Sequence, residues 1–256
     1  MISRYEVTLN GQNLSEINEN LLILNVGYER PEFQKTIFSP ANSETQIIQK
    51  RRKKQARVIV SFELHLYDIA ERQAVYQQVI SWCRNGGILQ TNDRPEMRLR
   101  VVCDEFPAIE SVRDWTQEMQ VTFAAYAYPY WEDADETVST LIGSNARGSM
   151  FVPGNIGETL ANVSVTTNDA ISHLSVSIGG NTITLTGISI PRGGVVQFGH
   201  DNNALLFIRN GSTSLLNKRT SASSDDLTAQ CGANNSIAVT ASASVTAQFS
   251  VRGCWL

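Results

Sequence analysis

A strict alternation of apolar and polar residues recurs along most of this chain, and it constrains the fold more than any other feature. The clearest run, residues 58–66, places Val58, Val60 and Phe62 on one side and Ser61 on the other. Successive side chains of a β-strand point to opposite faces, so this period of two predicts a half-buried strand. Shorter runs predict further strands at residues 22–26, 99–103 and 119–127, the last one ending at Pro129. The chain is therefore predicted to be mainly β.

One segment of the first half has helical periodicity instead. Apolar residues at helical spacing follow Asp68, and they predict a single buried face made of Ile69, Tyr76, Val79, Ile80 and Cys83. Asp68 is a suitable N-cap, and Gly86-Gly87 supply a C-terminal stop. We therefore expect one helix packed on a sheet in this half, which is an α+β arrangement.

Composition changes partway along the chain. All seven tyrosines precede position 131, and residues 1–133 hold 15 of the 21 Lys+Arg and 18 of the 25 Asp+Glu. After that point Ser, Thr, Asn and Gly separate short apolar alternations, with a hairpin turn at Gly179-Gly180. Many short strands without a helix indicate a sandwich. The change predicts two domains, an α+β domain at 1–133 and a β-sandwich at 134–256.

Charge and hydropathy argue against a nucleic-acid partner, a membrane-spanning helix and a secretory signal. The net charge of -4 is small for 256 residues, so bulk electrostatics do not favour nucleic acid. No stretch approaches the roughly 18 apolar residues that a membrane-spanning helix needs. The first residues lack the apolar core of a secretory signal, so the protein is expected to stay where it is made or to leave by a route that reads no signal.

Four cysteines, Cys83, Cys103, Cys231 and Cys254, are too sparse for a disulfide scaffold and contain no C-x-x-C pair. We expect reduced packing residues, and we predict no metal site and no cofactor. One alternative stays open: Cys231 and Cys254 lie in the same half and could pair in an oxidising medium.

No catalytic centre is recognisable. His65, His173 and His200 have no G-x-S-x-G motif nearby, so the chain is predicted not to be an enzyme. A cell-wall hydrolase remains an alternative that rests only on scattered carboxylates: Asp201, Asp225 and Asp226.

The acidic segment 132–136 is interpreted as a solvated linker between the domains, with a calcium site as the alternative. Its spacing is not that of an EF-hand loop.

The most basic run of the chain is Lys50-Arg51-Arg52-Lys53-Lys54. It precedes the strand that starts at Arg57, so an exposed hairpin arm is the economical structure. In an otherwise acidic protein such an arm favours contact with an acidic protein surface, for example another copy of the chain, over nucleic acid. These five residues, Lys50, Arg51, Arg52, Lys53 and Lys54, are the predicted interface residues.

The order of these features resembles the distal tail protein (Dit) family of long-tailed bacteriophages. The first half matches in Asn10-Gly11-Gln12-Asn13-Leu14, in the turn Asn92-Asp93-Arg94-Pro95-Glu96, and in a last strand that closes on Tyr128-Pro129-Tyr130-Trp131. The second half matches in residues 153–158 and 232–237. Ala41-Asn42-Ser43-Glu44 replaces the glycine-containing turn often found in the family's hairpin, so the path of the arm at 40–57 is left open.

The resemblance implies a structural hub protein of the phage tail tip or baseplate. Residues 1–133 would form a ring, usually of six copies, around a central channel, and residues 134–256 would form a galectin-like sandwich that projects outward. Implied partners are the major tail tube protein, the tail-associated fibre or lysin protein and receptor-binding proteins. The implied location is the virion tail tip, after assembly in the host bacterial cytoplasm.

The alternative function is a carbohydrate-binding module for host recognition, because galectin-like sandwiches can bind sugar by aromatic stacking. The sequence gives this alternative little support, since Trp255 is the only tryptophan after position 131.

Overall fold

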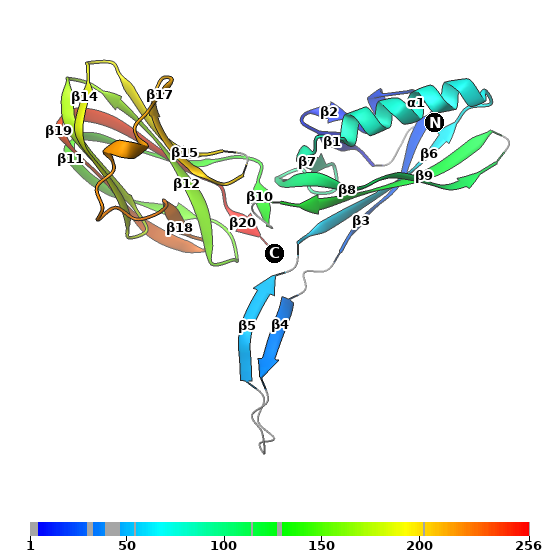
Figure 1. Cartoon of the computed structure of the whole chain (residues 1–256), viewed down its shortest axis with the longest axis horizontal. Helices are drawn as coiled ribbons and strands as arrows, with labels where there is room; N and C mark the ends of the chain where they lie inside the picture. The colour runs from blue at the N-terminus through cyan, green and yellow to red at the C-terminus, as the bar shows by residue number, and fades with distance from the viewer. Residues whose placement is uncertain are drawn as a thin grey trace. The chain divides into compact units, whose positions relative to one another are not determined.

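The computed structural model describes residues 5–29, 33–38, 47–53, 55–113, 115–126, 130–201 and 203–255 (Figure 1). Of 33–38 and 47–53 only the backbone is described. The chain divides into two compact units, Met1–Trp131 and Glu132–Leu256. The sequence-based limits were 1–133 and 134–256, and the independence of the two parts as folding domains stays a prediction.

The elements that begin in the first unit are β1 (Val7–Leu9), β2 (Gln12–Asn13), the 3-10 helix η1 (Leu14–Glu16), β3 (Leu21–Tyr28), β4 (Phe33–Phe38), β5 (Ile47–Lys53), β6 (Arg57–His65), α1 (Ile69–Cys83), β7 (Gly87–Thr91), β8 (Met97–Val112), β9 (Thr116–Ala125) and β10 (Trp131–Asp133). Seven strands pair in the order β2-β1-β7-β8-β9-β6-β3, and every one of these neighbouring pairs is antiparallel. The helix α1 lies across one face of this sheet (Figure 1). The expected α+β arrangement, a sheet that carries one helix, is confirmed.

The strand predicted at 58–66 is confirmed as β6. Its burial alternates without interruption, and Val58, Val60, Phe62 and Leu64 are fully buried. The alternation of Leu22, Leu24 and Val26 predicts that these three share one face of β3. Leu21, Ile23 and Val26 are the buried residues and Leu24 is 43% exposed, so the predicted face is correct only at Val26. The register of β3 against β6 shifts between Ile23 and Asn25, and such a bulge turns the following side chains to the opposite face.

The buried face of α1 also differs from the predicted one. It consists of Arg72, Val75, Val79, Trp82 and Cys83, whereas Ile69 is 72% exposed. An arginine would not be assigned to a buried face by hydropathy, because burial of a charge requires several hydrogen-bond partners. Arg72 has such partners, and they are described below.

Asp68 caps α1, as predicted. Its carboxylate accepts hydrogen bonds from the backbone N–H groups of Ala70 at 2.6 Å and Glu71 at 3.1 Å. Replacing Asp68 by alanine leaves these donors to solvent, so we expect the free energy of unfolding to fall by about 1 kcal/mol. Thermal denaturation of the Asp68→Ala and Asp68→Ser variants checks this, since serine is also a capping residue. Equal losses in both variants would contradict the capping role.

The elements of the second unit are β11 (Thr137–Val152), β12 (Glu158–Thr167), β13 (Ile171–Ile178), β14 (Asn181–Ile190), β15 (Val195–His200), β16 (Leu206–Asn210), β17 (Thr213–Ser214), the 3-10 helix η2 (Leu216–Lys218), β18 (Thr228–Gln230), β19 (Ala233–Val251) and β20 (Cys254–Trp255). The main sheet has the order β14-β13-β19-β12-β15-β16-β17, with β11 also paired to β19 and β18 to β12. The predicted hairpin at Gly179-Gly180 is confirmed, since Ile178 pairs with Asn181 across it.

The long strand β19 connects the two layers of this unit. Its residues 237–241 pair with β13, and its residues 245–251 pair with β12. The strand β11 follows it over nearly its whole length, with a register shift between Gly143 and Asn145. The sequence pattern predicts separate strands at residues 237–241 and 245–251, but β19 runs through both, and β11 pairs with residues 233–240 and 245–251 on either side of the register shift.

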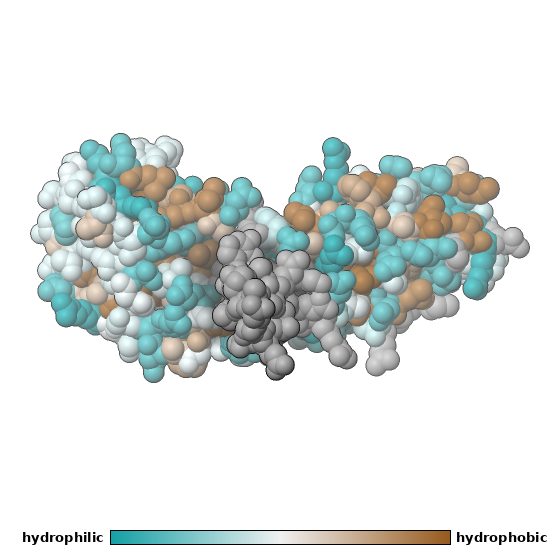
Figure 2. Space-filling model, turned by 60° about the horizontal axis from the view of Figure 1, so that its bottom comes forward, coloured by the Kyte–Doolittle hydropathy of each residue, from teal (hydrophilic) through white to brown (hydrophobic). Residues whose placement is uncertain are grey.

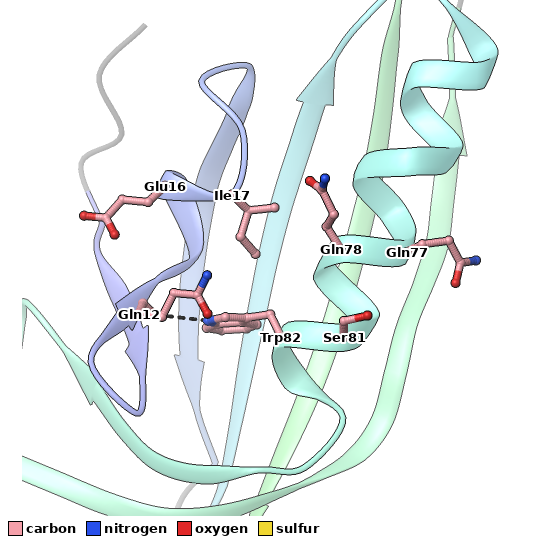
Figure 3. Close-up of a pocket in the computed structure, with 7 residues that line it drawn as sticks. All are labelled: Gln12, Glu16, Ile17, Gln77, Gln78, Ser81 and Trp82. Carbon is pink, nitrogen blue, oxygen red and sulfur yellow. Dashed lines mark hydrogen bonds between the residues drawn. The ribbon is translucent and has the colours of Figure 1, made fainter.

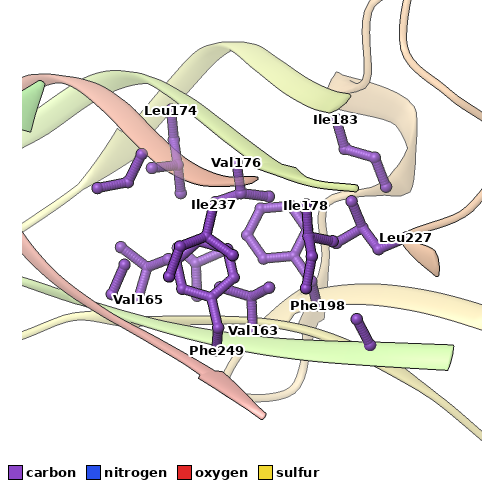
Figure 4. Packing of buried hydrophobic residues seen from close by; sticks show 14 of the residues in the cluster. Val163, Val165, Leu174, Val176, Ile178, Ile183, Phe198, Leu227, Ile237 and Phe249 are labelled. Atoms are coloured by element: carbon purple, nitrogen blue, oxygen red, sulfur yellow. The ribbon is translucent and has the colours of Figure 1, made fainter. Parts of the chain in front are cut away.

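The core of the second unit fills the space between the two layers (Figure 4). Val163 and Phe249 come from β12 and β19, and they pack against the layer that carries Leu174 and Val176. All four side chains are at most 2% exposed. The second unit is therefore a β-sandwich, in agreement with the sequence-based expectation.

Candidate interaction surfaces

The basic run lies in an antiparallel hairpin, as predicted. β4 and β5 pair only with each other in the described sheets, and Thr36 pairs with Lys50 and Lys35 with Arg51. The side chains of Lys50, Arg51, Arg52 and Lys53 are not described, and Lys54 lies outside the described residues. The role of these five residues in an interface stays a prediction.

The motif that begins at Asn10 meets the glycine pair Gly86-Gly87 at the end of α1. The Asn10 amide donates to the Gly86 carbonyl oxygen at 3.0 Å and accepts from the Ile88 N–H at 2.9 Å. Gly86 has a φ of 61°, and a Cβ there would lie 2.2 Å from the Val101 carbonyl oxygen. Only glycine therefore fits against β8 at this position, three residues after α1 ends at Cys83.

The turn at residues 92–96 and Trp131, the last residue of the aromatic motif, meet around Tyr28. The rings of Tyr28 and Trp131 are in edge contact with centroids 5.6 Å apart, and the Arg94 guanidinium lies 4.1 Å from the Tyr28 centroid and 4.9 Å from the Trp131 centroid. The Tyr28 hydroxyl donates to Asp93 at 2.6 Å and contacts the Thr91 hydroxyl at 2.8 Å. Burial and the Asp93 carboxylate raise the pKa of Tyr28 above its usual value, so the phenol stays neutral.

This aromatic and cationic cluster closes the first unit at its last residue, Trp131, which is only 5% exposed. Nothing in the sequence singled out Tyr28 as a partner of the aspartate turn. Tyr128 and Pro129, on which the predicted end of the last strand depended, lie outside the described residues, and β9 as described ends at Ala125.

Four exposed apolar side chains lie along the second half of β8 and in the turn into β9. Phe106 is 52% exposed, Ile109 45%, Val112 60% and Trp115 47%, and we call these four residues the β8–β9 patch. Register shifts follow Glu105 and Ile109, so the alternation of β8 is broken and apolar residues are exposed at every third position. Apolar side chains gather in several places on the first unit (Figure 2, right). Exposed apolar groups of this kind often mark protein contacts.

Arg72 fixes the turn beside this patch. Its guanidinium is buried and donates to the carbonyl oxygens of Leu66 at 2.5 Å, Tyr67 at 3.4 Å and Arg113 at 3.3 Å. One side chain of α1 therefore holds the loop after β6 and the end of β8 together. Trp115 packs on the same region, with its ring 5.2 Å from that of His65.

A polar pocket of about 520 Å³ lies between α1 and the segment around η1 (Figure 3). It is lined by Gln12, Glu16, Ile17, Gln77, Gln78, Ser81 and Trp82. The Trp82 indole N–H donates to the Gln12 carbonyl oxygen at 3.0 Å, and the indole ring borders the pocket near β2. With amide side chains and one carboxylate, this lining offers hydrogen bonds but no paired acid and base.

The second unit carries a smaller groove, of about 210 Å³, on the outer side of β12, β15 and β16. Neighbouring strands place polar side chains in one row, because Ser164 pairs with Gln197 and Gln197 pairs with Arg209. Arg209 donates to the Gln197 side chain at 2.9 Å, and its guanidinium lies 4.6 Å from the centroid of Phe207. The groove therefore combines hydrogen-bonding groups with one aromatic ring.

His200 lies at one end of this groove but has no catalytic arrangement. Its Nε2 lies 2.5 Å from the Asp226 carboxylate and its Nδ1 lies 3.3 Å from the Asn162 side-chain oxygen. Both ring nitrogens are thus occupied, and neither faces a nucleophile. Asp225 is fully exposed beside Arg219, and Asp201 accepts N–H bonds from its own loop, so the three carboxylates of the hydrolase alternative do not form a pair.

The acidic segment 132–136 is not a solvated linker throughout, which corrects the sequence-based interpretation. Glu132 is only 5% exposed, and the Asp133 carboxylate accepts a hydrogen bond from the Trp255 indole at 2.6 Å. Arg252 binds the Asp133 and Ala134 carbonyl oxygens and pairs with Glu136 at 3.2 Å. Residues near the end of β19 and in β20 thus bind part of this segment, and Trp255 takes a structural role.

Within the described residues, no group of three or more His, Cys, Asp or Glu side chains is arranged to hold a metal ion. No helix in the same part of the chain has the length and hydropathy needed to cross a bilayer.

These features define a mainly β protein with an α+β unit followed by a β-sandwich, and solved structures share this architecture over nearly the whole chain. The structure of SPP1 Dit, described as a paradigm of the hub adsorption apparatus in phages that infect Gram-positive bacteria, has a TM-score of 0.70 at 11% identity and covers 97% of this chain and 98% of its own. A chain of the phage P2 baseplate in its activated conformation with calcium has a TM-score of 0.57 at 9% identity, with 99% and 98% covered. A strontium form of that baseplate gives 0.54 at 9% identity, with 98% of both chains covered.

No protein-family profile matches the sequence, and no curated protein sequence matches it. At these identities the likeness establishes the fold.

Proposed function

We propose that this chain is a structural hub protein of a phage tail tip or baseplate. The observation that carries the proposal is the fold shared with SPP1 Dit across both units, with 97% of this chain covered. A protein with this role needs no catalytic site, and the polar pocket, the groove and His200 offer none. The proposed location is the virion tail, after assembly in the host cytoplasm.

In this proposal copies of the chain form a homo-oligomeric ring of six. The first units contact one another through the β8–β9 patch, because burial of exposed apolar side chains is the main driving force for stable association. The basic residues Lys50, Arg51, Arg52, Lys53 and Lys54 contact an acidic surface of a neighbouring copy. The ring joins the major tail tube protein to the tail-associated lysin or fibre protein, and the galectin-like second unit faces the receptor-binding proteins.

Native mass spectrometry of the purified full-length chain tests this function. We expect a closed oligomer of six copies, and binding to the tail tube protein of the same phage when the two are mixed. The hub role would be refuted by a chain that stays monomeric at high protein concentration and binds no tail component.

The groove of the second unit supports one alternative function, a carbohydrate-binding module for host recognition. Sugars are bound by planar polar side chains together with an aromatic face, and Gln197, Arg209 and Phe207 offer both. A glycan array probed with the full-length chain and with Arg209→Ala tests this. Binding that Arg209→Ala abolishes and the exposed control Arg147→Ala keeps would support a glycan site. An array without signal would leave the groove as a protein contact or a bare surface.

A further inference from the structure

Two cysteines that are distant in sequence meet at one end of the second unit. Cys254 begins β20, and Cys231 lies between β18 and β19. Interaction between the two thiols shifts the pKa of both, so the side chains lie near each other. Gly154 lies between them: it pairs with Cys254, and a Cβ on Gly154 would lie 3.0 Å from Cys231 Cβ and 2.4 Å from the Cys254 carbonyl oxygen. Glycine with a φ of 126° permits this close approach.

The backbone on both sides of this thiol pair is held by hydrogen bonds. The Cys231 N–H donates to the Gly157 carbonyl oxygen at 3.1 Å, and the Asn155 N–H donates to the Cys254 carbonyl oxygen at 3.1 Å. Cys254 is fully buried, and its thiol donates to the Thr159 hydroxyl at 3.2 Å. A disulfide requires Cβ atoms roughly 3.5–4.5 Å apart, and two cysteines that both lie against Gly154 need little movement to reach that geometry.

We propose that Cys231 and Cys254 are a disulfide-forming pair, which a small-molecule disulfide such as oxidised glutathione converts to an intramolecular bridge. The Cys231 thiolate attacks one sulfur of the oxidant and releases one glutathione thiolate, which leaves a mixed disulfide at Cys231. The Cys254 sulfur then attacks Cys231 Sγ, and its proton passes to the second departing glutathione. Two protein thiols are oxidised and one glutathione disulfide is reduced to two thiols.

The surroundings assign different roles to the two sulfurs. Cys231 is partly exposed and can meet the oxidant, whereas Cys254 is buried. Interaction with the Cys254 thiol lowers the pKa of Cys231 to about 7, so much of this thiol is ionised at neutral pH. The same interaction and burial raise the pKa of Cys254. Cys231 is therefore the attacking thiol of the first step, and Cys254 resolves the mixed disulfide.

Closure of this bridge links the C-terminal strand β20 to the start of β19. Because the bridge closes the loop of residues 231–254, it restricts the unfolded chain, and we expect the melting temperature of the second unit to rise by about 5–10 °C. This inference concerns the chemistry of the chain itself and does not depend on the proposed function.

The test uses the full-length chain with Cys83→Ser and Cys103→Ser, because those two thiols also interact with each other, in the first unit. The protein is equilibrated in glutathione buffers of increasing oxidised fraction and measured by intact mass spectrometry. We expect a mass loss of about 2 Da, for two hydrogens, and a cross-linked peptide pair that contains Cys231 and Cys254. The matched single variants Cys231→Ser and Cys254→Ser should show no such loss.

Two results would overturn the proposal. One is persistence of both thiols in a buffer that fully oxidises a reference dithiol. The other is a stable glutathione adduct on Cys231 that Cys254 does not displace. If the serine background does not fold, the same buffers are applied to the unaltered protein, and proteolytic peptides separate a bridge at Cys231 and Cys254 from one at Cys83 and Cys103.

Discussion

Replacement of Trp131 by alanine is expected to lower the free energy of unfolding of the first unit by about 3–5 kcal/mol. Trp131 is 5% exposed, its ring is in edge contact with Tyr28, and Arg94 covers both rings. The substitution removes an aromatic ring from a packed site and leaves a cavity at the point where the chain leaves the unit. Hydrogen exchange measured on peptides of β6 and β9 reports the first unit alone and checks this value.

Tyr67 supplies the control for this prediction. It is an aromatic residue of the same unit that is 79% exposed and lies outside the β8–β9 patch, so Tyr67→Ala should cost less than about 1 kcal/mol. Equal losses in the two variants would mean that the cluster around Trp131 is not the closing contact of the unit. A Tyr28→Phe variant, which keeps the ring contact but removes the hydrogen bonds to Asp93 and Thr91, should lose about 1–2 kcal/mol.

The elements with a strong local pattern could be predicted from the sequence. β6 is buried on one face only, so its alternation is complete, and α1 is bounded by an N-cap at Asp68 and a glycine stop at Gly86. These signals involve neighbouring residues, and each has a direct physical cause. They required no knowledge of the tertiary structure.

The long strands could not be predicted in the same way. β11 has only Leu141, Met150 and Val152 buried among its residues, so it shows no continuous alternation. It is a strand because it pairs with β19, and that contact is distant in sequence. The face of α1 was assigned correctly only at Val79 and Cys83, for a similar reason: Arg72 is buried because its three carbonyl partners come from loops outside the helix.

The candidate surfaces also combine residues that the sequence identifies with contacts that only the folded chain shows. The motif residues Asn10, Arg94 and Trp131 were recognised singly, but their contacts with Gly86 and Tyr28 appear only in the folded chain. The β8–β9 patch had no sequence signal, because its apolar residues are exposed through register shifts in β8. A bulge can be assigned only when the partner strand is known.

Conversion of this patch to a charged surface is expected to dissociate the proposed ring. The double variant Ile109→Lys/Val112→Lys places two cations on side chains that are 45% and 60% exposed, so the monomer should keep its fold. Glu110 and Glu118 lie on the same strand pair and offset part of the added positive charge, which stands next to Arg113, the present partner of Glu118 at 3.9 Å. Loss of two apolar contacts in an interface core costs about 2 kcal/mol each, which corresponds to roughly a 1,000-fold weaker association.

The control places the same charges on the second unit. Val138 and Ile142 of β11 are 48% and 70% exposed, so Val138→Lys/Ile142→Lys matches the first variant in exposure, residue type and added charge. Sedimentation velocity of the two variants and the unaltered chain should give monomers only for the patch variant. Because added positive charge and a general loss of stability act on both variants alike, a ring that survives Ile109→Lys/Val112→Lys would exclude the β8–β9 patch from the contact between copies. The basic hairpin residues Lys50 to Lys54 would then be the remaining predicted interface of the first unit.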